Sequence, residues 1–227
     1  MVTSEVFSAH IQDYAKAVYA LESRAGTAVS TNELAERLGV TPGSVSGMVR
    51  KLTELGLVEH EPYRGVRLTE QGRRVALEVL RHHRLIELFL AEELGMSWDR
   101  VHAEAEVLEH VISEDLEQLI SARLGDPSVD PHGDPIPTPE FEVRERETFS
   151  LEELPERAVG RFVRVSDSDP EMLRYLADHG VGLGDRLKVI GRQPFGGPVF
   201  VRSGGRELPL GGQLARAMRI ELEEPGR

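Results

Sequence analysis

Histidines and carboxylates gather in one short run of the sequence, between Val101 and His110. His102, Glu106 and the pair Glu109–His110 follow one another at spacings of three and four residues, so on a helix their side chains would share one face. His102 and His110 would be about 12 Å apart along such a helix at 1.5 Å per residue. The run therefore predicts two adjacent metal sites rather than one.

Other segments offer further ligands. His83 and Glu87 are four residues apart in the preceding predicted helix, where they can meet His102 across a helical hairpin, and Asp13 lies in the first predicted helix. The chain has no cysteine, and an oxygen-rich site with imidazole suits Mn(II) or Fe(II) better than a soft-ligand metal. The alternative is a solvated acidic helix face with incidental histidines, above all for His83 and Glu87.

Hydrophobic periodicity predicts the elements that carry these residues. Apolar residues at helical spacing predict an amphipathic helix from Phe7 to about Glu22. Helices at 31–39, capped by Ser30 or Thr31, and at 41–56, opened by a Thr-Pro pair, then form a helix-turn-helix. Residues 57–69 alternate apolar and polar around a turn at 63–65, which predicts a β-hairpin and so a winged helix.

The third helix has the composition of a DNA-reading helix. Small side chains on its early turns suit close approach to base edges; these are Thr41, Ser44, Ser46 and Gly47. Basic side chains at its end and in the hairpin are placed for phosphates; these are Arg50, Lys51, Arg64 and Arg67. The alternative is a winged helix that binds protein.

The rest of the chain predicts two further domains. Residues 70–97 and 99–124 are expected to form apolar-rich helices for metal binding and dimerisation, and the proline-rich stretch 125–147 a linker. Strands at 161–165, 186–190, 199–202 and 218–222, with a helix from Asp169 to Gly180, predict a small β-barrel. The fold class is mainly α with small β parts: a winged helix-turn-helix in 1–75, a helical domain in 76–147 and a β-domain in 148–227.

Charge and hydropathy narrow the class of protein. The net charge is −12, yet basic and acidic residues are equal in number over 1–75. A neutral DNA-binding domain holds nucleic acid weakly by itself, so dimerisation or an activating ligand is expected to strengthen it. With no signal-like N-terminus and no long apolar run, we expect a cytoplasmic protein without a membrane partner.

Taken together, the motifs resemble the diphtheria-toxin-repressor family over nearly the whole chain, and within it the actinobacterial manganese-responsive members. The similar segments are the first helix around 15–19, the wing and following turn at 63–72, the run 81–87, the run 102–110, and the stretch 130–137.

The resemblance implies specific site residues. It implies a primary metal site of Asp13, Glu106, Glu109 and His110, and an ancillary site of His83, Glu87 and His102, hence two metal sites per subunit. It also implies that the C-terminal domain is SH3-like, with Asp167 as a further ancillary ligand. Iron-responsive members carry Met and Cys at the positions of Asp13 and Glu106, so the carboxylates here favour manganese. Lys16 departs from a short-chain manganese regulator that has Glu there, so that regulator's two-metal arrangement is not expected unchanged.

The function implied is a homodimeric, Mn(II)-activated transcriptional repressor that binds a palindromic double-stranded operator and regulates metal homeostasis genes. The nearest alternative is an Fe(II)-responsive repressor of the same family. Another is a metal-independent winged-helix regulator that senses a small organic ligand. A hydrolytic metalloenzyme is disfavoured, because no nucleophile motif or phosphate loop accompanies the metal ligands, and a non-enzyme is expected.

Overall fold

The computed structural model describes residues 7–61 and 64–223, which divide into two compact units. The first unit holds the described parts of Met1–Ile86 with Ala105–Pro127 and Ile136–Val143. The second holds Glu87–Glu104, Ser128–Pro135 and the described parts of Arg144–Arg227. Within the described residues, no helix is both long and apolar enough to cross a membrane.

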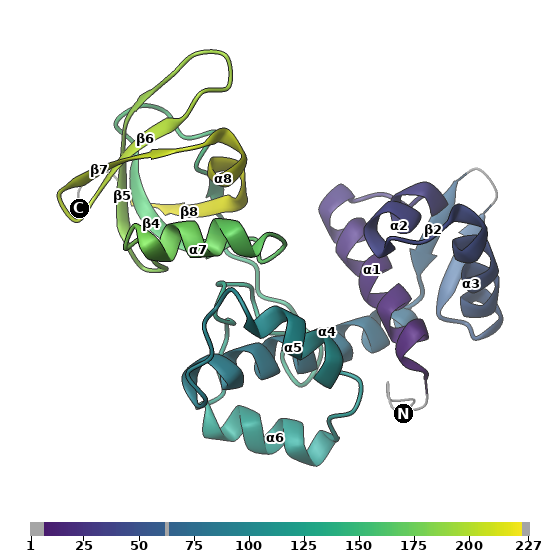
Figure 1. The fold of residues 1–227 in the computed structure, drawn as a ribbon. Helices are drawn as coiled ribbons and strands as arrows, with labels where there is room; N and C mark the ends of the chain where they lie inside the picture. Colours follow the sequence, from purple (N-terminus) through teal and green to yellow (C-terminus); the bar gives the residue numbers. More distant parts are fainter. Residues whose placement is uncertain (1–6, 62–63, 224–227) are drawn as a thin grey trace. The chain divides into compact units, whose positions relative to one another are not determined.

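A winged helix-turn-helix opens the first unit, as the sequence predicts (Figure 1). It consists of α1 (Ala9–Ala25), α2 (Thr31–Leu38), α3 (Pro42–Glu54) and the antiparallel pair β1 (Val58–Glu61) and β2 (Gly65–Leu68). Its core combines one apolar face from each element, with Val18, Leu34, Val45, Leu52 and Val66 all fully buried. The first helix starts at Ala9 and ends at Ala25, a slight shift from the predicted bounds. Tyr63, at the predicted hairpin turn, lies outside the described residues.

Gly72 allows close packing between the wing and the helix that follows it. The helix α4 (Glu70–Glu92) begins directly after β2. A Cβ atom on Gly72 in its first turn would lie 1.9 Å from the carbonyl oxygen of Leu57, which no side chain can tolerate. The helix therefore starts in contact with the base of the wing.

The predicted helix over 99–124 is wrong: it is two helices, α5 (Val101–Leu108) and α6 (Glu114–Arg123). Ser113 has an extended backbone and its hydroxyl accepts a hydrogen bond from Leu116 N–H at 3.3 Å, so α6 begins there as an independently capped helix. Glu109 and His110 consequently lie in the turn after α5, although Glu109 N–H still donates to the carbonyl of Ala105 at 2.9 Å and so keeps the helical spacing from Glu106. The preceding helix also ends at Glu92, short of the predicted residue 97.

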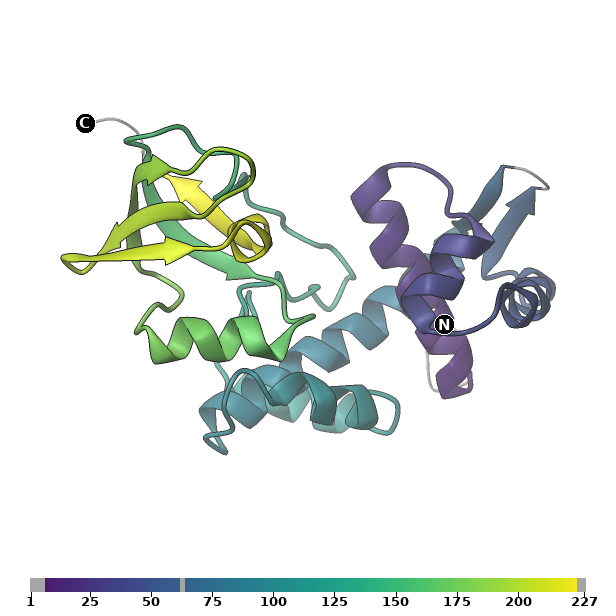
Figure 2. The same cartoon turned by 45° about the horizontal axis from the view of Figure 1, so that its top comes forward.

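The second unit contains an antiparallel sheet with strand order β3-β8-β4-β5-β6-β7. Its strands are β3 (Phe149–Ser150), β4 (Val159–Val165), β5 (Arg186–Arg192), β6 (Val199–Ser203), β7 (Arg206–Leu210) and β8 (Met218–Leu222), accompanied by α7 (Pro170–Asp178) and α8 (Gly212–Ala217). The apolar residues of α7 pack on the strand core, so this helix lies along the sheet (Figure 2). The predicted SH3-like barrel is confirmed, although β3, β7 and α8 were not predicted because they are short and lack a clear apolar period.

The proline-rich stretch is irregular, as predicted, but part of it is tightly packed. Asp130 and His132 are buried, and the Asp130 carboxylate accepts hydrogen bonds from the backbone N–H groups of His132 and Asp134 at 2.8 and 2.9 Å. The carbonyl of His132 accepts a hydrogen bond from Val165 N–H at 2.9 Å, which joins this segment to the end of β4. The segment Asp130–Asp134 is thus an ordered part of the second unit.

Candidate metal centres and nucleic-acid interface

Titratable side chains from α1, α4 and the end of α5 meet within the first unit. We call this group the first cluster; it comprises Asp13, Lys16, His83, Glu106, Glu109 and His110. Asp13 and Lys16 are three residues apart and so lie on one side of α1, while Glu106 is on α5 and Glu109 and His110 are in the following turn. Glu109 contacts Lys16 and His110 contacts Asp13, so these two consecutive residues both reach side chains of α1.

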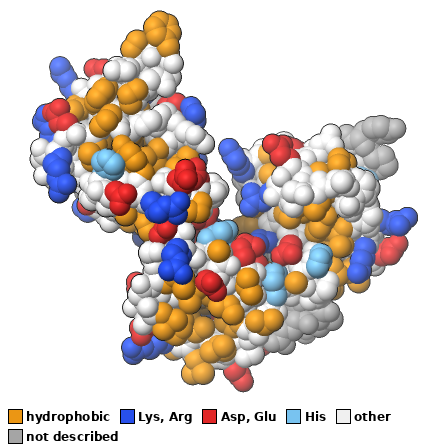
Figure 3. All heavy atoms as spheres, in the orientation of Figure 1, with side chains coloured by type: hydrophobic (Ala, Val, Ile, Leu, Met, Phe, Trp, Pro, Cys, Tyr) orange, Lys and Arg blue, Asp and Glu red, His pale blue; other side chains and the backbone are white. Residues whose placement is uncertain are grey.

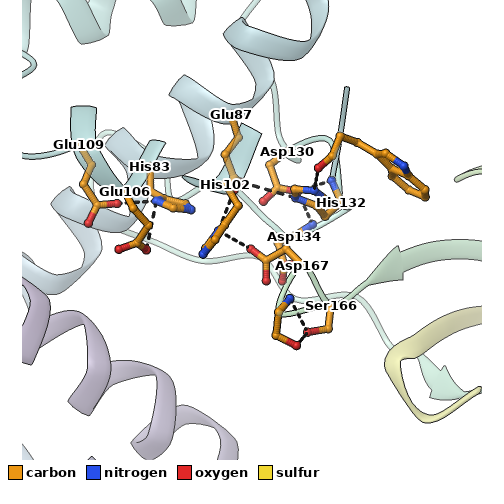
Figure 4. A network of polar contacts seen from close by, with 12 residues as sticks. His83, Glu87, His102, Glu106, Glu109, Asp130, His132, Asp134, Ser166 and Asp167 are labelled. Carbon is orange, nitrogen blue, oxygen red and sulfur yellow. Dashed lines mark hydrogen bonds and ion pairs between the residues drawn. The ribbon is translucent and has the colours of Figure 1, made fainter. Parts of the chain in front are cut away.

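Glu109 is the centre of the first cluster, and its side chain is fully buried. It forms a short hydrogen bond with His83 Nδ1, and its Oε1 lies 2.5 Å from Lys16 Nζ and 3.4 Å from His110 Nε2. Glu106, by contrast, is 42% exposed and lies 2.8 Å from Lys16 Nζ. Figure 4 shows Glu106 and Glu109 both directed at the ring of His83. These contacts give a buried carboxylate with positively charged or protonatable partners on several sides.

The orientation of His110 is set by Gln12, a buried residue that sequence reasoning did not select. The side-chain N–H of Gln12 donates to the carbonyl of Phe7 at 3.2 Å, so its Oε1 faces the His110 ring as an acceptor. Nδ1 of His110 therefore carries a proton and donates it to Gln12, while Nε2 lies 3.0 Å from Asp13 Oδ1. A histidine held through one ring nitrogen presents the other to a ligand, which is the usual arrangement at metal sites.

The first cluster satisfies the spacing needed for an ion. Ligand atoms of Asp13, Glu109 and His110 all lie within 4.8 Å of one another. Those of His83, Glu106 and Glu109 form an adjoining group that meets the same limit and shares Glu109. Two carboxylates with an imidazole suit a hard or borderline divalent ion, so the residues fit the chemistry predicted for them.

A second cluster lies within the second unit and comprises Glu87, His102, Asp130, His132 and Asp167. Nδ1 of His102 lies 2.9 Å from Asp167 Oδ2 and 3.2 Å from Glu87 Oε1, and ligand atoms of these three residues lie within 4.8 Å of one another (Figure 4). Glu87 is on α4, His102 at the start of α5, and Asp167 follows β4. The predicted residues Glu87, His102 and Asp167 are therefore brought together.

The charged side chains of the second cluster strongly affect one another's pKa values. Hydrogen bonds that the ring donates to Asp167 and, second, to Glu87 raise the pKa of His102 to about 10. Burial raises the pKa of Asp167, but the hydrogen bond with His102 outweighs it, so the net pKa is lowered. In the metal-free protein His102 is a cation paired with two carboxylates, and a metal ion that binds its ring must displace this proton.

His132 was missed by the sequence analysis because it stands in a proline-rich stretch that was treated as a linker. Its side chain is fully buried, with Nε2 donating to the carbonyl of Trp98 at 2.7 Å and Nδ1 3.7 Å from Glu87 Oε2. Burial lowers the pKa of His132, but the nearby negative charge of Glu87 outweighs this effect and raises the pKa to about 9. His132 thus holds the opposite side of the carboxylate that contacts His102. The Asp-Pro-His-Gly-Asp sequence was the available signal.

The predicted DNA-contacting residues share one property: they are exposed, whereas Val45, Val49 and Leu52 of α3 are buried. The exposed set is Thr41, Ser44, Ser46, Gly47, Arg50, Lys51 and Arg64. Thr41 also caps α3, accepting from Ser44 N–H at 3.2 Å. Arg67 forms an ion pair with Glu22 of α1 at 3.2 Å, so part of its role is to attach the wing to the first helix.

Comparison with known proteins matches each of these parts. Family models match residues 6–66 as an iron dependent repressor N-terminal DNA binding domain, 69–138 as an iron dependent repressor metal binding and dimerisation domain, and 149–222 as a FeoA domain. The iron-dependent repressor IdeR of Mycobacterium tuberculosis is 33% identical over 220 residues, covering 92% of this chain and 95% of the relative. The diphtheria toxin repressor of Corynebacterium glutamicum is 32% identical over 222 residues, covering 93% and 95%.

Solved structures that resemble this chain are also metal-dependent regulators. A manganese-dependent transcriptional repressor in complex with manganese has 43% identity and a TM-score of 0.88, covering 94% of this chain and 100% of that chain. The manganese regulator SloR has 32% identity and a TM-score of 0.75, covering 94% and 98%. On domain content, sequence identity and fold together, this chain belongs to the diphtheria-toxin-repressor family of metal-dependent transcriptional repressors.

Proposed function

We propose that this protein is activated by Mn(II) and, as a homodimer, represses metal homeostasis genes by binding a palindromic operator. The observation that carries the proposal is the first cluster, where ligand atoms of Asp13, Glu109 and His110 lie within 4.8 Å of one another. Asp13 lies in the part matched as DNA-binding and the other two in the part matched as metal-binding. We assign Asp13, Glu106, Glu109 and His110 to the primary site.

An ion held by these residues would supply positive charge that joins α1 to the turn after α5. Because α1 belongs to the DNA-binding domain, this junction restricts the position of the reading helix within its subunit. We infer that the two reading helices of a metal-free dimer sample many separations. Activation would restrict them to the separation that matches the distance between adjacent major grooves. A 100-fold gain in operator affinity requires about 2.7 kcal/mol of coupling, and by linkage the operator raises metal affinity equally.

The second cluster is our proposed ancillary site. Glu87, His102 and Asp167 provide two carboxylates and one imidazole, and His83 is the remaining ancillary ligand proposed from the sequence. The buried contacts of His132 and Asp130 support the placement of Glu87. An ion bound there would replace the charge that protonated His102 provides between Glu87 and Asp167.

A homodimer is supported by exposed apolar side chains around α6. Val107, Val111 and Leu119 are 69%, 77% and 68% exposed, and Figure 3 shows apolar side chains gathered over this part of the first unit. Apolar patches of this kind mark protein interfaces. The location falls in the segment matched as a dimerisation domain.

Manganese is favoured over iron by the donor set. Neither cluster contains a thiol or thioether, and both combine carboxylates with imidazole, which suits Mn(II). The manganese-dependent neighbour at 43% identity also favours manganese, whereas the relatives named iron-dependent are 31% to 33% identical. Fe(II) is the alternative, because carboxylates and imidazole also bind it.

The test is operator binding measured by fluorescence anisotropy with a palindromic duplex of the family type, in parallel with chelator, Mn(II), anaerobic Fe(II) and Zn(II). We expect tight binding with Mn(II) and weak binding with chelator. Equal operator binding in chelator and in Mn(II) would show that metal does not activate the protein, and it would favour a regulator that senses an organic ligand.

The same titration with Asp13→Ala and Glu106→Ala tests the ligand assignment. We expect both variants to lose the manganese-stimulated component while keeping the weak binding seen in chelator. If either variant keeps full stimulation, that residue is not a primary ligand.

A further inference from the structure

A lysine ammonium lies inside the proposed primary site. Nζ of Lys16 is 2.8 Å from Glu106 Oε1 and 2.5 Å from Glu109 Oε1, and the lysine side chain is only 15% exposed. The Glu109 oxygen that it contacts is the same atom that lies 3.4 Å from His110 Nε2. The ammonium therefore shares a ligand oxygen with the group of atoms to which we assign the ion.

Glu109 needs a positive partner whenever the protein is folded. Its side chain has no exposed surface, and a buried carboxylate without a counter-charge is strongly destabilising. Lys16 supplies that charge from α1, one turn away from Asp13. Burial lowers the pKa of Lys16, but the charges of Glu109 and Glu106 outweigh it and raise the pKa, so the amine stays protonated.

We propose that Lys16 is a built-in counter-cation of the primary site, which a divalent ion must displace from Glu106 and Glu109, so that Lys16 sets the metal concentration at which the repressor responds. The proposal rests on the proposed function and concerns the regulation of the same site. It requires only that a flexible lysine side chain swing towards solvent, and its four-carbon stem allows this while α1 stays in place.

The positive charge of Lys16 has opposite effects on the metal-free and the metal-bound protein. In the metal-free state, the single charge of the ammonium offsets part of the negative charge of Glu106 and Glu109 and stabilises the fold. In the metal-bound state, the same charge repels the ion or must be moved away. Removing the charge should therefore weaken the metal-free protein and tighten metal binding at the same time, a combination that a purely structural lysine would not produce.

The experiment compares Lys16→Met, Lys16→Gln and Lys16→Arg in the full-length chain. Lys188→Met, on an exposed position of β5, is the matched control for loss of a lysine charge. Every protein carries His102→Gln, so that the second cluster does not contribute. Free Mn(II) is followed by electron paramagnetic resonance during titration, and thermal unfolding is measured with chelator and with saturating Mn(II).

For Lys16→Met and Lys16→Gln we expect a Kd for Mn(II) at least about tenfold lower, which corresponds to about 1.4 kcal/mol. We also expect a lower Tm in chelator and a larger rise in Tm on adding Mn(II). Lys16→Arg and Lys188→Met should behave like the parent. If Lys16→Met fails to fold, Lys16→Gln, which keeps hydrogen-bonding capacity without charge, gives the same comparison.

Two outcomes would overturn the proposal, and they can be told apart. An unchanged or higher Kd in both uncharged variants, with the Tm lowered equally in chelator and in Mn(II), makes Lys16 a structural residue and leaves the proposed function standing. Absence of Mn(II) binding in the parent and in every variant would reject the proposed function itself.

Discussion

At the scale of single residues, the two clusters use buried carboxylates in the same way. Glu109 in the first and Glu87 in the second both have side chains with no exposed surface, and each has histidine neighbours on more than one side. The low polarity around a buried carboxylate strengthens its attraction for any cation. These two residues therefore hold the positive charge of each site, whether it comes from protonated side chains or from metal.

Gln12 is expected to act on metal affinity without touching the ion. In Gln12→Leu the acceptor for His110 Nδ1–H is lost, so the ring is no longer held with Nε2 towards Asp13. Outer-sphere changes of this type weaken metal binding by about 10- to 100-fold. Isothermal titration calorimetry with Mn(II) measures the change. Gln193→Leu, at an exposed position, is the control, and equal affinities for both variants would contradict the assigned role of Gln12.

The metal-free protein is expected to lose stability as pH rises. The pKa values of His102 and His132 in the folded protein are about 10 and about 9, above the ordinary 6.5. A raised folded pKa gives stabilisation that is complete below pH 6.5 and is lost as pH rises through the folded values. Thermal unfolding in chelator at several pH values from 6.5 to about 10 should show Tm falling across this range.

The variant His132→Gln tests whether His132 is one cause of the fall in Tm with rising pH. It should give a flatter dependence of Tm on pH, because one of the two raised groups is gone. His60→Gln, on an exposed position of β1, should leave the slope unchanged. A His132→Gln profile parallel to the parent would show that His132 does not contribute.

At the scale of elements, the break between α5 and α6 determines the geometry of the first cluster. The cap at Ser113 starts a new helix and places Glu109 and His110 in a turn. Glu109 N–H still donates to the carbonyl of Ala105 at 2.9 Å, so Glu109 is the last residue that follows the helical spacing of α5. Glu109 and His110 both contact side chains of α1 from this position, namely Lys16 and Asp13.

One face of α3 is buried in the core and the other is exposed, and the exposed face gives a prediction for DNA binding. Arg50 lies late in the helix and is exposed, where it is expected to contact phosphate. Arg50→Ala should weaken Mn(II)-activated operator binding about tenfold for any sequence and reduce the slope of log affinity against log salt by about one. Anisotropy at several salt concentrations measures both effects. Arg206→Ala in β7 is the control, and a loss confined to one operator sequence would instead indicate a base contact.

At the scale of the whole molecule, binding to the proposed palindromic operator would require two subunits. The exposed apolar residues around α6 are the best candidates for the surface that joins them, because similar exposure is costly in a monomer. The domain division at 1–75, 76–147 and 148–227 remains a prediction. The compact units seen here group 105–127 and 136–143 with the N-terminal part of the chain.

Leu119→Glu is expected to disrupt the dimer. Burying Leu119 contributes about 1.5–3 kcal/mol, and a carboxylate in its place adds a desolvation cost, so dimerisation should weaken by well over tenfold. Size-exclusion chromatography with light scattering measures the mass at several concentrations. Phe195→Glu, which replaces an exposed apolar residue in the β5–β6 loop, should leave the mass unchanged. A dimeric Leu119→Glu protein would place the interface elsewhere.

Periodicity, capping residues and local motifs act over short distances along the chain, so the sequence predicts the winged helix, the small β-domain and most of the titratable residues in the two clusters. The tertiary structure decided what those patterns do not encode. It ended α5 at Leu108, packed His132 against Glu87, placed Gln12 behind His110 and set Lys16 between two proposed ligands. Each of the last three contacts joins segments far apart in sequence, and burial and charge at such contacts depend on packing.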